Sequence, residues 1–271
     1  MESGNLYYET AGRGHTLVLI HAAFLDSRMW DREFKLYSEN YQVIRYDVRG
    51  FGKSDRPRDK FSDYKDLYSL LKHLGVGKAC LLGISNGGRI ALDFVSMHPE
   101  MVEALILVGT GVRGYQISGP DEEKEWNEFD ARVMAKEEAK EKAIKEKRLK
   151  DAVTIEVDLW ASAVSAELRE PIFKIAMDNS DALVDPPGGR LQVSPQPPAF
   201  ARLEEIKIPT LLIIGTKDVS GTMVTKRLSS IIPGSKMVLL QGADHIANMS
   251  KPREFDRTVL GFLNTEIRGP E

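Results

Sequence analysis

A serine flanked by glycines follows an apolar stretch of the chain. Ser85 is the centre of Gly83-Ile84-Ser85-Asn86-Gly87, which fits the pattern G-x-S-x-G. The apolar run 79–82 precedes it, and a helix-like segment begins at Asn86. A serine on a sharp strand-to-helix turn stands exposed at the end of a sheet, where it can act as a nucleophile. The helix N-terminus behind it favours developing negative charge.

A serine hydroxyl is a poor nucleophile without a base, and the base needs a group that orients it. Among the five histidines, His245 follows the last β-rich run and is expected on a loop. Asp218 comes shortly after the β-rich run 210–214. We therefore expect Ser85, Asp218 and His245 to form a catalytic triad. Asp244 is the alternative acid, although neighbouring residues rarely orient each other's side chains.

Alternating strand-like and helix-like segments are expected to carry these three residues. Several of the strand-like runs are almost continuously apolar, a pattern typical of strands covered on both faces. Helix-like segments at 28–39, 63–74 and 86–97 separate the early runs. This alternation predicts an α/β fold with a mostly parallel sheet and crossover helices. The strand-like runs are 17–20, 42–46, 79–84, 104–108, 210–214 and 236–240.

The alternation stops between Gly111 and Phe200. In residues 121–151, 11 acidic and 9 basic side chains make up 20 of the 31 positions. Glu141 and Lys145 are an example of the i,i+4 pairs typical of a solvated helix. The following stretch, 153–164, is amphipathic and contains Trp160. We expect the charged stretch to form the outer surface of a separate helical unit, and the amphipathic one to face the cleft or the core.

Composition excludes several classes of function. The 37 Lys+Arg and 40 Asp+Glu residues give a net charge of −3, which argues against a nucleic-acid-binding face. The chain has no polybasic anchor and no run of ~20 apolar residues, so we expect no association with a membrane. The single cysteine, Cys80, rules out an internal disulfide. No metal-ligand spacing or dinucleotide motif is present, so we expect no metal and no cofactor. The N-terminus lacks the pattern of a signal peptide, which predicts a cytoplasmic protein.

Together these motifs resemble the α/β-hydrolase superfamily, whose triad runs in the order Ser, Asp, His along the chain. The segment Asp47-Val48-Arg49-Gly50-Phe51-Gly52-Lys53-Ser54 is similar to the family's D-x-R-G-x-G-x-S loop, and 85–88 to its S-x-G-G elbow. His245, Pro252 and Phe255 resemble its C-terminal pattern. The resemblance implies an α/β-hydrolase core in 1–112 and 201–271, with an inserted helical cap in 113–200.

The resemblance also implies the remaining site residues. An oxyanion hole takes two backbone N–H groups, which correspond here to Asn86 and to Ala23 in the loop after the first parallel strand. The family usually has His-Gly-x in that loop, whereas this chain has His21-Ala22-Ala23. Ala22 would be strained if its position required a positive φ. His21 is expected to support the loop, and Phe24 and Trp160 to contact substrate.

The resulting hypothesis is a serine hydrolase that cleaves a small-molecule carboxylic ester. The alternative is a lactonase, because His245-Ile246-Ala247-Asn248 resembles the corresponding segment of enol-lactone hydrolases. Dehalogenases and epoxide hydrolases of this fold use an aspartate at the elbow, so Ser85 argues against both. Carbon–carbon bond hydrolases tend to carry tryptophan after the histidine and resemble this chain less. A ligand receptor that kept the fold would have no need of a complete triad.

Overall fold

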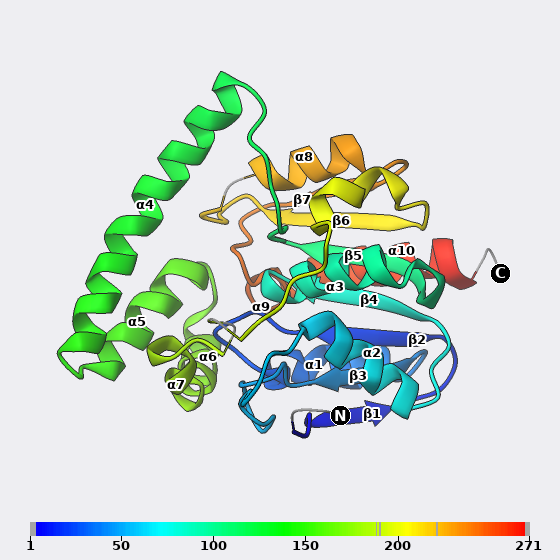
Figure 1. The fold of residues 1–271 in the computed structure, drawn as a ribbon, viewed down its shortest axis with the longest axis horizontal. Helices are drawn as coiled ribbons and strands as arrows, with labels where there is room; N and C mark the ends of the chain where they lie inside the picture. Colours follow the sequence, from blue (N-terminus) through cyan, green and yellow to red (C-terminus); the bar gives the residue numbers. More distant parts are fainter. Residues whose placement is uncertain (1–3, 188, 190, 221, 269–271) are drawn as a thin grey trace.

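The central element is a seven-stranded sheet with the order β1-β3-β2-β4-β5-β6-β7 (Figure 1). A computed structural model describes residues 4–187, 189, 191–220 and 222–268. Strand β1 pairs antiparallel with β3, and every other neighbouring pair is parallel. The strands are β1 Tyr8–Ala11, β2 Thr16–Ile20, β3 Gln42–Tyr46, β4 Ala79–Ile84, β5 Val102–Val108, β6 Thr210–Gly215 and β7 Lys236–Leu240.

Burial on both faces explains the apolar strands. Every residue of β2, β4 and β6 is buried. Along β2, Leu17 and Leu19 belong to one hydrophobic core, while Val18 and Ile20 belong to the other, as the two-residue period of a strand requires. The predicted fold class is confirmed. The sequence did not predict β1, because this short edge strand is only half-buried and carries no apolar run.

Helices cover both faces of the sheet (Figure 1). Helices α1 and α10 contribute to the same core as Leu17, whereas α2, α3 and α8 contribute to the core on the opposite face. These helices are α1 Asp31–Tyr37, α2 Asp63–His73, α3 Asn86–Met97, α8 Met223–Ile231 and α10 Pro252–Leu263. Shorter segments are η1 Ser27–Trp30, η2 Pro99–Met101, η3 Ala199–Glu205, α9 Ala247–Ser250 and η4 Asn264–Arg268.

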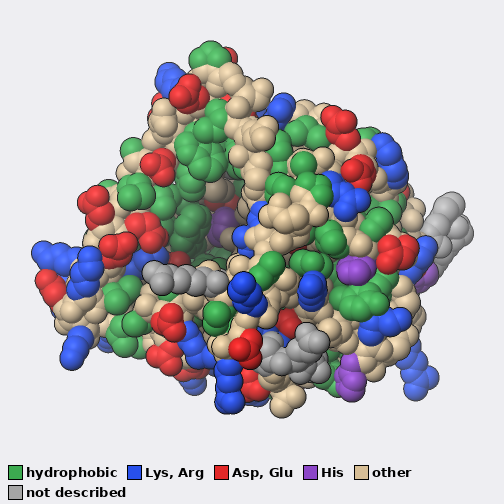
Figure 2. Space-filling model, viewed as in Figure 1, with side chains coloured by type: hydrophobic (Ala, Val, Ile, Leu, Met, Phe, Trp, Pro, Cys, Tyr) green, Lys and Arg blue, Asp and Glu red, His purple; other side chains and the backbone are tan. Residues whose placement is uncertain are grey.

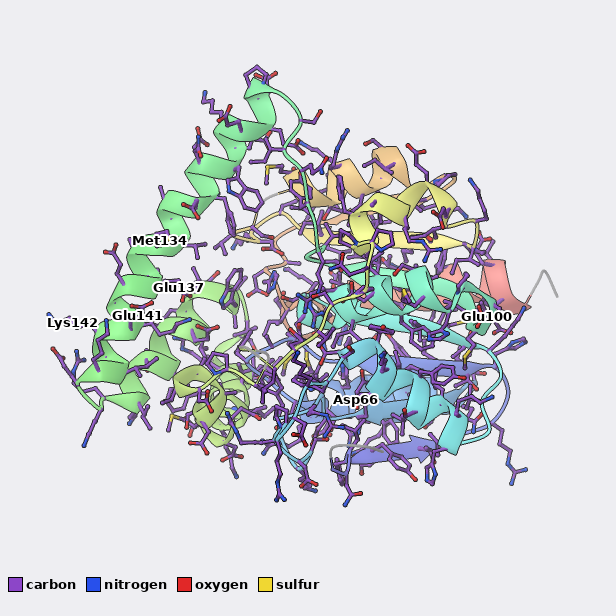
Figure 3. All side chains as sticks on the ribbon, viewed as in Figure 1. Asp66, Glu100, Met134, Glu137, Glu141 and Lys142 are labelled. Atoms are coloured by element: carbon purple, nitrogen blue, oxygen red, sulfur yellow. The ribbon has the colours of Figure 1, made fainter. Side chains whose placement is uncertain are left out.

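Between β5 and β6 the chain leaves the sheet and forms a helical insertion. It contains α4 Pro120–Lys145, α5 Leu149–Trp160, α6 Ala166–Asp178 and α7 Ser180–Val184. Helix α4 packs on α5 and stands apart from the sheet along much of its length (Figure 1). Met134, Glu141 and Lys142 of α4 are exposed, and Figure 3 labels them along the helix. The charged stretch therefore presents a largely solvated surface.

Another side of α4 carries a half-buried apolar stripe. Trp126, Phe129 and Val133 follow one another at helical spacing and are all of intermediate burial. Figure 2 shows this face of the molecule hollowed between α4 and the sheet domain, with hydrophobic side chains along the hollow. The high charge of α4 hid this stripe, because its apolar members are few.

Candidate active site

The serine lies at a sharp turn between β4 and α3. Ser85 has φ 56° and ψ −113°, and Lys147 is the other described non-glycine residue with a positive φ. Such a backbone costs of order 1–3 kcal/mol and persists only where the surroundings fix it. Here the Ser85 N–H donates to Val108 O at 2.8 Å, and Ser85 O accepts from the Arg89 N–H at 3.0 Å.

The flanking glycines are required by space. A Cβ on Gly83 would lie 2.3 Å from the carbonyl carbon of Gly87, and one on Gly87 would lie 2.2 Å from Ile20 O. No side chain fits at these separations, so β2, β4 and α3 can meet this closely only with glycine at both positions. The G-x-S-x-G pattern therefore has a direct physical cause in this fold.

His245 and Asp218 form a buried pair on the loops after β7 and β6. Nδ1 of His245 lies 2.8 Å from Oδ2 of Asp218. The other carboxylate oxygen of Asp218 accepts from the Ser220 N–H at 2.9 Å and from the Ser220 hydroxyl at 2.7 Å. The carboxylate is thereby held in one orientation. This arrangement places the proton of a neutral His245 on Nδ1 and leaves Nε2 as the basic nitrogen.

The loop after β5 brings the serine to this pair. Val108, whose carbonyl accepts from Ser85, is followed by Gly109 with φ 50°. A Cβ at Gly109 would lie 2.8 Å from Asp218 Oδ2 and 3.0 Å from His245 Nδ1. The adjacent residues Val108 and Gly109 therefore contact the serine turn on one side and the Asp218–His245 pair on the other, at the edge where the parallel strands end. Gly109 was not identified from the sequence, because one glycine in a loop gives no signal.

Charge and burial oppose each other at the pair. Burial alone disfavours the carboxylate of Asp218, but His245 and the Ser220 hydrogen bonds outweigh it and lower its pKa. Burial likewise disfavours the imidazolium, yet Asp218, with smaller contributions from Asp244 and Glu156, raises the pKa of His245 above 6.5. The imidazolium that forms during proton transfer is thus stabilised.

Asp244 points away from this pairing. Its Oδ2 accepts from the Ala163 N–H at 2.6 Å, so it ties the loop before His245 to the end of α5 in the insertion. Burial is the main cause of the raised pKa of Asp244. Because the ring nitrogen of His245 is bound by Asp218, the geometry favours Asp218 over Asp244 as the orienting acid. The contact between Asp244 and Ala163 was not foreseen from the sequence.

His21 supports the loop that carries Ala23. The Val48 N–H donates to Nε2 at 2.8 Å, so Nδ1 carries the proton and donates to Ala22 O, also at 2.8 Å. The imidazole thus joins this loop to the D-x-R-G segment, and its ring packs edge-on against Phe51 at 5.4 Å. Ala22 is fully buried and does not have a positive φ, so alanine in place of glycine causes no backbone strain.

A cavity of about 260 Å³ adjoins the serine turn. Ala23, Phe24 and Asn86 all line it, so the structure brings the two expected oxyanion donors and one expected substrate contact together. Its polar walls also include Asp63 and Glu156. Glu156 comes from α5, is buried, and binds Lys140 Nζ at 2.7 Å. The sequence did not indicate Glu156, because a carboxylate within a charged insertion looks like surface.

Trp160 lies directly on the histidine. The ring centroids of Trp160 and His245 are 4.5 Å apart and the ring planes are inclined at 44°. Val153 and Val157 of the same helix are fully buried. The amphipathic stretch of the insertion therefore packs toward the core, with its tryptophan over the acid–base pair. Among the described residues, no cluster of three or more His, Cys, Asp or Glu side chains could hold a metal ion.

Comparison with known proteins identifies the family of the chain. A family model described as alpha/beta hydrolase fold matches residues 15–252. The chain belongs to the α/β-hydrolase family. Within this family it is 25% identical to 3-oxoadipate enol-lactonase 2 of Acinetobacter baylyi, over 94% of this chain and 91% of that enzyme. It is 28% identical to the 2-hydroxy-6-oxononadienedioate/2-hydroxy-6-oxononatrienedioate hydrolase of Escherichia coli K12, over 95% and 90% of the two chains.

Solved structures similar to this chain include the crystal structure of a bromoperoxidase from Bacillus anthracis. This α/β-hydrolase chain aligns with it at a TM-score of 0.74 and 26% identity, over 96% of this chain and 95% of that one. The relatives of known sequence and the fold together support a hydrolase that acts on a small molecule. None of the described helices has the length and apolar character needed to cross a membrane.

Proposed function

We propose that this α/β-hydrolase is a serine hydrolase that cleaves carboxylic esters through an acyl-enzyme on Ser85. The hydrogen bond between His245 Nδ1 and Asp218 Oδ2, beside the serine turn, is the observation that carries the proposal. A ligand receptor or a structural domain would gain nothing from a buried acid–base pair next to a strained serine.

Each residue has a defined role in this mechanism. Nε2 of His245 accepts the hydroxyl proton as Ser85 Oγ attacks the ester carbonyl, and Asp218 stabilises the resulting imidazolium. The N–H groups of Asn86 and Ala23 bind the oxyanion of the tetrahedral intermediate. His245 then protonates the leaving alcohol, and the acyl group stays on Ser85. Water, activated by the same imidazole, releases the acid and restores the serine.

The chemistry serves a lactone equally well, since a lactone is a cyclic ester. The similarity to an enol-lactonase favours that second candidate. The walls of the cavity bear on the choice between substrates. Asp63 and Glu156 are acidic, and Arg49, the cation among the described residues that line the cavity, is already bound through two nitrogens to Asp66 of α2. An uncharged acyl group or lactone is therefore favoured over one that carries a carboxylate.

Release of p-nitrophenol from p-nitrophenyl acetate, butyrate and hexanoate tests the proposal. Ser85→Ala is the control, because it removes the nucleophile and leaves the cavity. Turnover by the wild type that Ser85→Ala abolishes supports a serine esterase, whereas equal rates for the two proteins would refute it. Titration of the acid released from an unsubstituted lactone and from a carboxylate-bearing lactone, on the same preparation, decides between the candidate substrates.

A further inference from the structure

A closed ring of hydrogen-bonded polar side chains lies beside the serine turn. Arg89 of α3 binds Asp93 Oδ2 at 2.9 Å, and Arg113 binds the same oxygen at 3.1 Å. Arg113 also donates to Gln192 Oε1 at 2.6 Å. Gln192 donates to Asp63, and Arg89 donates to the same Asp63 oxygen, which closes the ring. Two arginines balance two aspartates, and both aspartates are buried.

The ring is attached to a candidate oxyanion donor. Nε and Nη2 of Arg89 both donate to Oδ1 of Asn86, at 2.9 and 2.7 Å. The Arg89 guanidinium therefore holds Asn86 and both aspartates at once, with its side chain mostly buried. Only the rigid planar fork of arginine can make this set of bonds, since a lysine ammonium lacks the paired nitrogens.

The same ring joins the two ends of the helical insertion. Arg113 lies just after β5, where the chain leaves the sheet, and Gln192 lies where it returns. The returning segment is fixed by a β-bridge between Gln192 and Phe61, with hydrogen bonds from Phe61 N to Leu191 O at 3.0 Å and from Val193 N to Phe61 O at 2.7 Å. Gln192 also lines the cavity that Asn86 borders.

We infer that Arg89 is a positioning residue that aims the Asn86 N–H at the oxyanion, and that the ring couples this N–H to the seating of the insertion. The inference rests on the proposed serine-hydrolase function. The physical reason is the strain at Ser85: a backbone with φ 56° keeps its geometry only if neighbouring contacts fix it. The clamp on the side chain of the next residue is such a contact.

The test compares Arg89→Lys with Arg202→Lys. Arg202 makes the matched control because it binds the far part of α3, at Ser96 O, and is outside the ring. For each protein we measure kcat and KM with p-nitrophenyl butyrate. We also measure inhibition by an alkyl trifluoromethyl ketone, whose adduct with serine carries an oxyanion. Arg89→Lys is expected to lower kcat about ten- to a hundredfold, less than the ~10²–10³ for deleting an oxyanion donor, because the N–H remains.

Inhibition by the ketone distinguishes a positioning role of Arg89 from a purely structural one. If Arg89 aims the N–H, the ketone's inhibition constant rises by the same factor as kcat/KM falls, while KM changes little and Arg202→Lys behaves like the wild type. An Arg89→Lys protein with a lower melting temperature but unchanged ketone affinity and kcat would overturn the inference. A wild type that releases no p-nitrophenol from any ester would overturn the proposed function instead.

Two further variants keep the inference testable if Arg89→Lys does not fold. Asn86→Ala retains the backbone N–H but removes the clamped oxygen, so it should lower kcat by a similar factor. If Arg89→Lys does fold, the double variant Arg89→Lys/Asn86→Ala should be no worse than either single variant, because both changes break the same link. Gln192→Leu opens the ring at the insertion and should give a smaller loss of kcat with the same rise in the ketone's inhibition constant. Additive losses, or a Gln192→Leu change confined to KM, would contradict the coupling.

Discussion

Replacing Asp218 with asparagine should disable the base without disturbing its position. Oδ1 of Asp218 accepts a fixed backbone N–H and a hydroxyl from Ser220. The oxygen of an asparagine must stay on that side, because an amide NH₂ there would face the Ser220 N–H. The NH₂ group is then turned toward His245, where Nδ1 can only accept. The imidazole proton therefore moves to Nε2, the atom that has to receive the serine proton.

The size of the loss follows from this wrong tautomer. A comparable change in a serine protease triad lowers kcat by ~10⁴, which corresponds to about 5 kcal/mol at 1.36 kcal/mol per factor of ten. Stopped-flow or long-time assays with p-nitrophenyl butyrate from pH 6 to 10 measure it. Asp244→Asn is the matched control, since an amide oxygen can still accept from Ala163 N. A loss below tenfold, or a larger loss in Asp244→Asn, would refute the assignment of Asp218.

The other predictions concern the nucleophile, the insertion and the pH dependence. Ser85→Ala should lower kcat by ~10⁶ at an unchanged melting temperature, and residual activity within tenfold of the wild type would exclude Ser85 as the nucleophile. Trp160→Ala should change KM or chain-length preference across acyl esters. Glu141→Lys, at an exposed ion pair on α4, should leave the kinetics unchanged and shift the unfolding free energy by under ~0.5 kcal/mol. The opposite pattern would contradict the orientation of the insertion described above. Activity should rise with pH through an apparent pKa above 6.5, because neutral His245 is needed and its pKa is raised. Glu156→Gln should move that limb to lower pH, since one of the charges that raise the pKa is lost, and a shift to higher pH would contradict this.

Most of the strands could be predicted from the sequence, because burial on both faces leaves an apolar run, whereas their order in the sheet could not. Residues 79–84 are both the predicted and the observed β4. The edge strand β1 escaped prediction because only one neighbour and partial burial determine it. A partly buried edge strand forms because it pairs with its neighbour, and a single sequence does not show which segments pair.

For the site, residue type and position after a strand were sufficient to select Ser85, Asp218 and His245 as candidates. Contacts between distant segments were not accessible in the same way. Glu156 lies against the cavity only because α5 is turned toward the sheet, and the bond between Gln192 and Arg113 joins positions separated by the whole insertion. Such contacts depend on how the helices pack against one another, and a local sequence pattern does not determine that packing.

The point where the insertion leaves and rejoins the sheet has a consequence for how this protein can change. Phe200 N donates to Arg113 O at 3.2 Å, so the two connections run side by side. A segment whose ends meet can be lengthened, shortened or exchanged without moving the strands that carry the serine, aspartate and histidine loops. The insertion can thus vary while the strands stay in place, provided that it keeps the side chains that reach the site, Gln192 in the ring and Trp160 on His245. A graft of a relative's insertion between residues 113 and 200 should therefore leave the sheet and its loops in place, but it would keep the ring only if it supplied an equivalent of Gln192.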